Sequence, residues 1–228
     1  MPRILLLITM IWSLSQTLLL IPDQVISTSD GSTNIVFDLN IRILNDTAFV
    51  SLNDYADGFL YDMKYASADN FLKQQVYSCS DCVIRKEVAD ALIACNKEFL
   101  EKHDLRIKLF DCYRPLSVQK QMWSIFPDGR YVANPYKSGS IHNRGGAVDI
   151  TLVDLQSKEL DMGTSFDHFG EEAHHAFQNL PQTVLANRKL LKGVMENHGF
   201  KAIRTEWWHY NYRGARSYPL SDFKTDCQ

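Results

Sequence analysis

The stretch SGSIHNRGGAVDI, residues 138–150, places a histidine, a glycine pair and an aspartate just before an apolar run that is typical of a β-strand. Alternate side chains of a strand share one face, so Asp149 is expected to point to the same side as Thr151. The glycine pair at 145–146 can adopt backbone angles that other residues avoid, which lets the preceding loop fold back. The sequence therefore predicts that His142 and Asp149 lie close together.

An imidazole beside a carboxylate suits a divalent metal ion such as zinc. A catalytic zinc site uses three protein ligands and leaves a fourth position open for water, so a third ligand is needed. His209 is the candidate that we choose, because it lies in the strand-like run TEWWHYNY (205–212) with Glu206 three residues before it. A hydrogen-bonded turn around His142 is the alternative, since this spacing of histidine and aspartate alone is a weak pattern.

The composition indicates one domain. The chain has 228 residues, of which 45% are hydrophobic and 11% aromatic, enough for a single core. Its formal net charge is −3 and its basic residues are scattered, which gives no reason to expect a nucleic-acid partner. We expect residues 28–228 to form one α+β unit.

Periodicity outlines the elements of this unit. A helix is predicted from Asp81 onward, with one core face formed by Val88, Leu92, Cys95 and Phe99. The run RIKLFDCYR (106–114) predicts a strand, and Pro115 suits the first turn of a short helix. A second long helix is predicted over 183–200 and is ended by Gly199. The run AVDITLVDL (147–155) and the TEWWHYNY run are predicted strands, the latter closing the sheet.

The N-terminal segment, residues 1–27, resembles a secretory signal, because Arg3 precedes an apolar stretch that reaches Ile21. An uncleaved membrane anchor is the alternative, although polar residues at 13 and 15–17 interrupt the apolar stretch. We expect an exported, periplasmic protein, with secretion or membrane anchoring as alternatives. No other membrane partner is expected.

Five cysteines are compatible with an oxidising compartment, and their odd number leaves at least one thiol without an intrachain partner. The segment CSDC (79–82) could be a redox motif or half of a zinc knuckle. A second pair at zinc-ribbon spacing is absent from the sequence, so a structural disulfide is favoured and its pairing is left open.

Several further motifs are more specific because they occur together. They are DMKYASADNF (62–71), DCYRP (111–115), SxHxxGxAxD (140–149), MGTSFDHF (162–169), NRKLLKGVMENHGF (187–200) and EWWHY (206–210). In this order, over about residues 55–215, they resemble the D-alanyl-D-alanine dipeptidases of the vancomycin-resistance type, a family of zinc D,D-peptidases. Chance agreement of several ordered motifs is improbable.

The resemblance implies a fold and a set of roles. The fold is α+β, with helices around a small antiparallel sheet, as in the hedgehog-like zinc D,D-peptidases. The implied roles are one zinc ion per chain held by His142, Asp149 and His209, a general base at Glu206, an oxyanion donor at Arg114, and substrate-binding positions at Asp167, Ser140 and Tyr65. Asp167 matches the carboxylate that binds the free ammonium of the substrate. The pair His174 and His175 is assigned packing or hydrogen bonding only.

The role of Glu206 carries a structural expectation. Residues three apart on a regular strand point to opposite faces, yet Glu206 and His209 must both face the metal. We therefore expect a bend or bulge in this strand.

The implied activity is zinc-dependent hydrolysis of D-Ala-D-Ala, in cell-wall peptide turnover or D-Ala salvage, because the signal-like N-terminus and extra cysteines differ from the intracellular dipeptidases. One alternative is a D,D- or L,D-carboxypeptidase or endopeptidase that acts on murein stem peptides. The other is a non-catalytic zinc-binding recognition module. Asp167 argues against the first, and Glu206 with Arg114 argues against the second, since binding alone needs neither a base nor an oxyanion donor.

Overall fold

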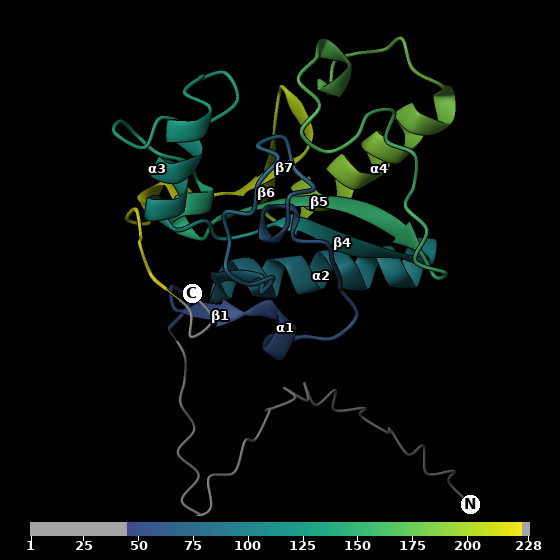
Figure 1. Ribbon diagram of the computed structural model, residues 1–228. Coiled ribbons are helices and arrows are strands. Elements are labelled where there is room, and N and C mark those ends of the chain that lie inside the picture. The colour runs from purple at the N-terminus through teal and green to yellow at the C-terminus, as the bar shows by residue number, and fades with distance from the viewer. Residues whose placement is uncertain (1–44, 225–228) are drawn as a thin grey trace, which may run out of the picture. The chain divides into compact units, whose positions relative to one another are not determined.

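The computed structural model describes residues 45–224, and a five-stranded sheet lies at its centre (Figure 1). The strand order is β2-β4-β5-β7-β6. The strands are β2 (Leu60–Tyr61), β4 (Leu105–Asp111), β5 (Ala147–Asp154), β6 (Phe200–Ile203) and β7 (Glu206–Tyr212). The expected leader, residues 1–27, lies outside the described residues, as does the start of the expected domain at residue 28.

The sheet is mixed, not purely antiparallel as expected. Four strands pair antiparallel, but β2 pairs parallel with β4. Parallel neighbours need a crossover connection, and here the chain runs from β2 through α2 (Lys86–His103) before it enters β4. Strand β7 is the last strand along the chain, as predicted, and it is an inner strand of the sheet because β6 takes the edge.

Helices cover the sheet. Figure 1 shows α2 running along β4 and β5, and α4 (Gln182–Asn197) leading into β6. The predicted core face of α2 is confirmed, because Val88, Leu92, Cys95 and Phe99 are all fully buried. Gly199 follows the end of α4 with a φ of 92°, as predicted for a residue that ends a helix in left-handed geometry. The α+β fold class is confirmed.

Two helix starts differ from the prediction. Residues 83–85, predicted as helix, form the short strand β3 (Val83–Arg85), which pairs antiparallel with β1 (Phe49–Ser51). The β-branched Val83 and Ile84 favour this extended backbone. Pro115 lies just outside α3 (Leu116–Ile125) as its N-cap residue, and the strand before it already ends at Asp111. The remaining helix, α1 (Leu52–Tyr55), is a single turn.

The disulfide prediction is confirmed for one pair. Cys82 is bonded to Cys112, which connects the start of β3 with the end of β4. The two cysteines of the CSDC segment therefore do not pair with each other. Cys95 is a buried free thiol within α2.

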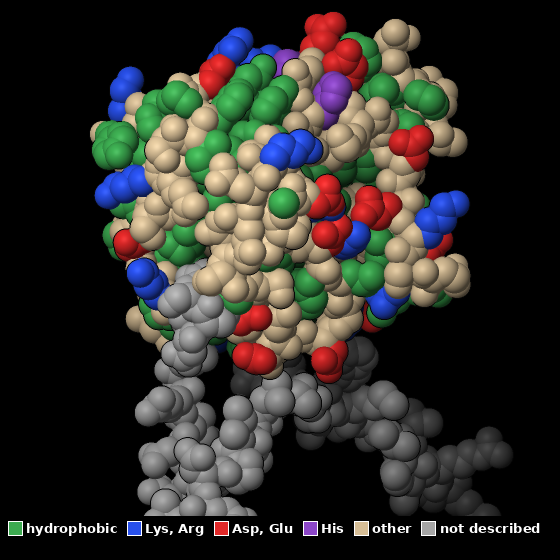
Figure 2. Space-filling view, in the orientation of Figure 1, with side chains coloured by type: hydrophobic (Ala, Val, Ile, Leu, Met, Phe, Trp, Pro, Cys, Tyr) green, Lys and Arg blue, Asp and Glu red, His purple; other side chains and the backbone are tan. Residues whose placement is uncertain are grey.

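The charged side chains are mixed on the surface. On the face shown in Figure 2, acidic and basic groups lie next to one another. Lys108, for example, pairs with both Asp62 (2.9 Å) and Glu159 (2.8 Å). Among the described residues, no helix combines the length and apolar character needed to cross a membrane.

Candidate metal centre and active site

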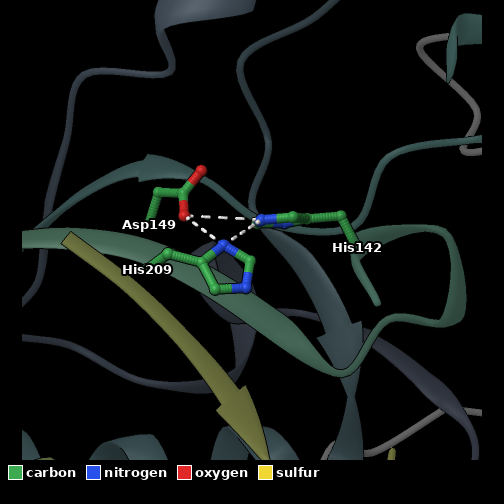
Figure 3. Close-up of side chains that lie close together, drawn as sticks. All are labelled: His142, Asp149 and His209. Atoms are coloured by element: carbon green, nitrogen blue, oxygen red, sulfur yellow. Dashed lines mark hydrogen bonds and ion pairs between the residues drawn. The ribbon is translucent and has the colours of Figure 1, made fainter. Parts of the chain in front are cut away.

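The structure brings His142, Asp149 and His209 together (Figure 3). Asp149 on β5 and His209 on β7 are direct partners in the antiparallel ladder. His142 opens a 3-10 turn (His142–Arg144), and Gly145 follows with a φ of 69° that folds the chain back toward β5. One potential ligand atom from each residue lies within 4.8 Å of the other two. The predicted proximity of His142 and Asp149 is thereby confirmed.

The three groups face one another at short distances. Nδ1 of His209 is 3.0 Å from Oδ1 of Asp149, and Nε2 of His142 is 3.4 Å from the same oxygen. The two ring nitrogens are 3.2 Å apart. All three residues are buried. Polar groups taken out of water need partners, and these three side chains contact one another.

The hydrogen bonds of the outer nitrogens indicate which tautomer each histidine adopts. Nδ1 of His142 lies 2.7 Å from the carbonyl oxygen of Cys112, and Nε2 of His209 lies 2.9 Å from Oδ1 of Asn211. Both oxygens can only accept, so these nitrogens carry the hydrogens. In the neutral tautomers of both rings, the two inner nitrogens then bear the lone pairs that face the carboxylate of Asp149. Three lone-pair donors converging in a buried space suit a bound cation, and two imidazoles with one carboxylate are ligands that zinc accepts.

The electrostatics of the cluster also favour positive charge. Burial alone would lower the pKa of His209, but the hydrogen bond and charge of Asp149 outweigh it and raise the pKa to about 9. The pKa of Asp149 is lowered, because the two histidines outweigh its burial. The protein thus keeps this carboxylate ionised.

Glu206 lies beside the cluster, and the expected irregularity of its strand is confirmed. The pairing of β6 with β7 shifts register between Ala202 and Ile203, so Ile203 is the partner of Glu206. This irregularity allows Oε2 of Glu206 to lie 3.8 Å from Nδ1 of His209 on the metal-facing side. Burial raises the pKa of Glu206.

Arg114 is buried at the end of the segment that leaves β4. Its guanidinium forms an ion pair with Asp111, donates to Oε1 of Gln119 (3.0 Å), and lies 3.4 Å from the hydroxyl of Tyr77. The sequence did not predict these holding residues. Asp111 belongs to the quoted DCYRP motif, which was a usable signal, whereas neither Gln119 nor Tyr77 stands out in the sequence.

Tyr65 connects Arg114 with Asp167. The hydroxyl of Tyr65 donates to Oδ2 of Asp167 (3.0 Å), and the guanidinium carbon of Arg114 lies 5.0 Å from the centre of the Tyr65 ring. Asp167 has a φ of 57°, a conformation that a residue other than glycine rarely adopts. Burial, with the negative charge of Asp149, raises the pKa of Asp167 well above its usual value. Three predicted site residues therefore form one group.

The other candidates lie in different surroundings. Oγ of Ser140 accepts a hydrogen bond from the backbone N–H of His142 (3.2 Å), so this side chain supports the turn that carries a predicted ligand. Its substrate-binding role stays a prediction. His175 packs against Tyr210, with ring centres 6.3 Å apart, and burial lowers its pKa to about 4.

Comparison with known proteins agrees with the motifs. The family model described as D-ala-D-ala dipeptidase (peptidase M15) matches residues 45–226. The D-alanyl-D-alanine dipeptidase of Escherichia coli (strain K12) is 36% identical over 166 residues, which cover 73% of this chain and 85% of that protein. The D-alanyl-D-alanine dipeptidase of Enterococcus faecium is 33% identical over 198 residues, covering 78% and 97%.

Among solved structures, a mutant of the vancomycin-resistance D,D-pentapeptidase VanY in complex with Zn(II) is similar to this chain at a TM-score of 0.39. It is 15% identical, and the match covers 60% of this chain and 76% of that one. The family assignment rests on the sequence matches, which span most of the chain and agree with each other. The chain belongs to the D-alanyl-D-alanine dipeptidase family.

Proposed function

We propose that this chain is a zinc-dependent dipeptidase that hydrolyses D-Ala-D-Ala and holds one zinc ion. One observation carries the proposal: His142, Asp149 and His209 direct three lone-pair donors into one buried space, and Glu206 lies 3.8 Å from one of them. Family membership supports the dipeptide as substrate. Zinc bound by these three residues would supply Lewis-acid chemistry and make a water molecule acidic near neutral pH.

Glu206 is the proposed base. Its carboxylate faces the cluster, and its side chain keeps 29% of its surface exposed, so it can reach both water and substrate. It accepts a proton from the attacking water at a carboxylate oxygen. The same group then delivers that proton to the nitrogen of the leaving D-alanine, which becomes the free amine.

Arg114 is the proposed oxyanion donor. A guanidinium has five N–H groups, and the contacts to Asp111, Gln119 and Tyr77 engage three of them. Two N–H groups are then left for the carbonyl oxygen of the substrate. Because the guanidinium is already held in place, it needs no reorganisation as negative charge develops on that oxygen.

Asp167 supports a dipeptidase over the carboxypeptidase or endopeptidase alternative. Asp167 is partly buried. A carboxylate in such a place is stabilised by a charged partner, and the ammonium of a free dipeptide is such a partner. A murein stem peptide carries an amide at that position and would leave the carboxylate of Asp167 without a charged partner. Tyr65 already donates to one oxygen of Asp167.

Export is a further part of the proposal. It is supported by the signal-like residues 1–27 and by the buried disulfide between Cys82 and Cys112, since such bonds persist in oxidising compartments. An exported enzyme of this kind would act in the periplasm on dipeptide released by cell-wall turnover, or in D-Ala salvage.

The metal can be tested separately from the reaction. Elemental analysis of the purified protein should find about one zinc per chain, and a chelator should abolish D-Ala-D-Ala hydrolysis until zinc is added back. The variant His142→Ala should lose both metal and activity because it removes one of three ligands. His175→Ala, outside the site, is the matched control. A folded His142→Ala protein with full zinc content and activity would remove this ligand assignment.

A further inference from the structure

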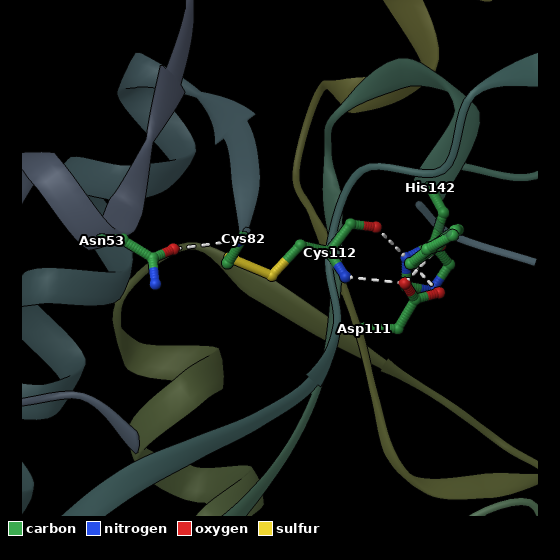
Figure 4. The surroundings of a disulfide bond; sticks show 6 residues. Asn53, Cys82, Asp111, Cys112 and His142 are labelled. Carbon is green, nitrogen blue, oxygen red and sulfur yellow. Dashed lines mark hydrogen bonds and ion pairs between the residues drawn. A yellow bond between two sulfur atoms is a disulfide. The ribbon is translucent and has the colours of Figure 1, made fainter. Parts of the chain in front are cut away.

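The disulfide between Cys82 and Cys112 joins the small β1-β3 sheet to the sheet that carries the site (Figure 4). Cys82 precedes β3, and Cys112 directly follows β4. Both half-cystines are fully buried. This bond is therefore a covalent connection between the two sheets at the point where the chain leaves β4 for Arg114.

The peptide groups of Cys112 contact two parts of the site. Its carbonyl oxygen accepts from Nδ1 of His142 at 2.7 Å, the bond that leaves Nε2 of the same ring facing Asp149. Its N–H donates to Oδ1 of Asp111 at 2.9 Å, and the other oxygen of Asp111 pairs with Arg114. A shift of Cys112 would consequently disturb both the proposed metal ligand and the proposed oxyanion donor.

Strand β3 supports the same two parts from the other side of the disulfide. The carbonyl oxygen of Val83 accepts from the N–H of Tyr113 (2.9 Å), next to Arg114. The N–H of Arg85 donates to the carbonyl oxygen of Gly145 (3.0 Å), at the end of the turn that holds His142. Backbone hydrogen bonds from β3 thus reach both the segment of Arg114 and the turn of His142.

Cys82 is itself fixed. Its N–H donates to Oδ1 of Asn53 (3.0 Å), and its carbonyl oxygen accepts from the N–H of Leu52 (2.7 Å). The disulfide therefore ties Cys112 to an anchored point.

We propose that the Cys82–Cys112 disulfide is a positioning element of the metal site, acting through the Cys112 carbonyl on His142. The inference rests on the proposed function, because it assumes that His142 binds the metal. A group that orients a metal-binding histidine affects metal affinity, typically by about 10-fold to 100-fold when it is lost. If the disulfide only stabilised the fold, its removal would lower the unfolding temperature and leave the zinc affinity of the folded protein unchanged.

The test compares the unmutated protein with the double variant Cys82→Ala/Cys112→Ala, which removes both sulfur atoms and introduces no new thiol. Zinc is titrated into each metal-free protein at a temperature where both are folded. We expect the variant to bind zinc about 10-fold or more weakly. Cobalt(II) in place of zinc should show visible absorption bands of altered position or intensity, because these bands report how the ligands are arranged.

Leu191→Ala is the matched control, because it truncates a fully buried side chain in α4, a helix that carries none of the groups above. It should lower the unfolding temperature and leave zinc affinity and the cobalt spectrum unchanged. If the Cys82→Ala/Cys112→Ala variant does not fold, Cys82→Val/Cys112→Ala is used instead, since valine fills part of the volume that the sulfur atoms leave.

Equal zinc affinity and equal cobalt spectra in the disulfide variant and the unmutated protein would overturn the positioning role alone. If neither double variant folded, the positioning role would also be overturned, because the disulfide would then be required for folding of the whole domain. If the unmutated protein bound no zinc in this titration, the proposed function itself would fail, so the two failures are distinguishable.

Discussion

Glu206 differs from the three proposed ligands in distance and exposure. Its Oε2 is 3.8 Å from Nδ1 of His209, whereas Oδ1 of Asp149 is 3.0 Å from the same nitrogen. Its side chain is 29% exposed, against 5% for Asp149. A carboxylate near a metal site that remains open to water is placed to exchange protons, whereas the enclosed Asp149 is placed to bind.

The variant Glu206→Gln separates these two roles. We expect it to keep its zinc while kcat for D-Ala-D-Ala falls about 100-fold or more, because the amide fills the same space but cannot accept the proton. Metal analysis and steady-state kinetics measure the two effects on one sample. Glu159→Gln, which removes only a surface partner of Lys108, should change neither. Loss of zinc from Glu206→Gln, or turnover at the normal rate, would contradict the assignment.

The individual residues of the site were predictable to different degrees. Spacing alone placed His142 near Asp149, because a glycine pair and a strand period constrain a short segment. The third proposed ligand, His209, lies 60 residues beyond Asp149; it was chosen for its strand-like run beside Glu206, and the resemblance then supported that choice. Gln119 and Asn211 were missed, because a residue that holds another side chain has no local pattern of its own, whereas Asp111 was missed although it stands in the quoted DCYRP motif.

At the scale of elements, the turn before β5 places His142. Gly145 has a φ of 69°, and a Cβ added there would lie 2.5 Å from Cε1 of Phe49. Both the backbone conformation and the available space therefore favour glycine at this position. The turn is thus fixed by backbone geometry as well as by the hydrogen bond that Oγ of Ser140 accepts from the N–H of His142.

We expect Gly145→Ala to lower the free energy of unfolding by about 1 kcal/mol or more, because alanine is strained at this φ and its methyl group meets Phe49. Gly193→Ala is the control, and it is expected to have the opposite effect on stability. Gly193 lies within α4, where an added Cβ meets nothing within 4 Å, so alanine should stabilise by about 0.5–1 kcal/mol. Urea unfolding of the metal-free proteins compares the two. A Gly145→Ala protein as stable as the unmutated one would refute this view of the turn.

Elements with a strong period were predicted well, and short ones were not. The buried face of α2 and the strand β5 follow from repeated apolar residues. Strand β3 has three residues and β2 has two, too few to show a period. The parallel placement of β2 depends on where the chain crosses after α2, which no local pattern of residues specifies.

At the scale of the whole molecule, the proposed substrate site consists of Arg114, Tyr65 and Asp167 beside the proposed metal ligands. They come from three separate segments that meet only in the folded chain. Their sequence separation reaches 102 residues between Tyr65 and Asp167, which share a hydrogen bond. Composition could exclude broad classes of partner, but only the ordered motifs identified a site assembled from such distant segments.

The central claim is that this protein cleaves a free dipeptide, and its most direct test compares kcat/KM for D-Ala-D-Ala and N-acetyl-D-Ala-D-Ala with zinc-loaded protein. Acetylation removes the ammonium that would pair with Asp167 and leaves its carboxylate without a charged partner, a loss that can reduce kcat/KM by about 10⁴-fold. We therefore expect rapid hydrolysis of the free dipeptide and almost none of the acetylated one. Comparable kcat/KM values for the two would contradict the dipeptidase account and favour a carboxypeptidase.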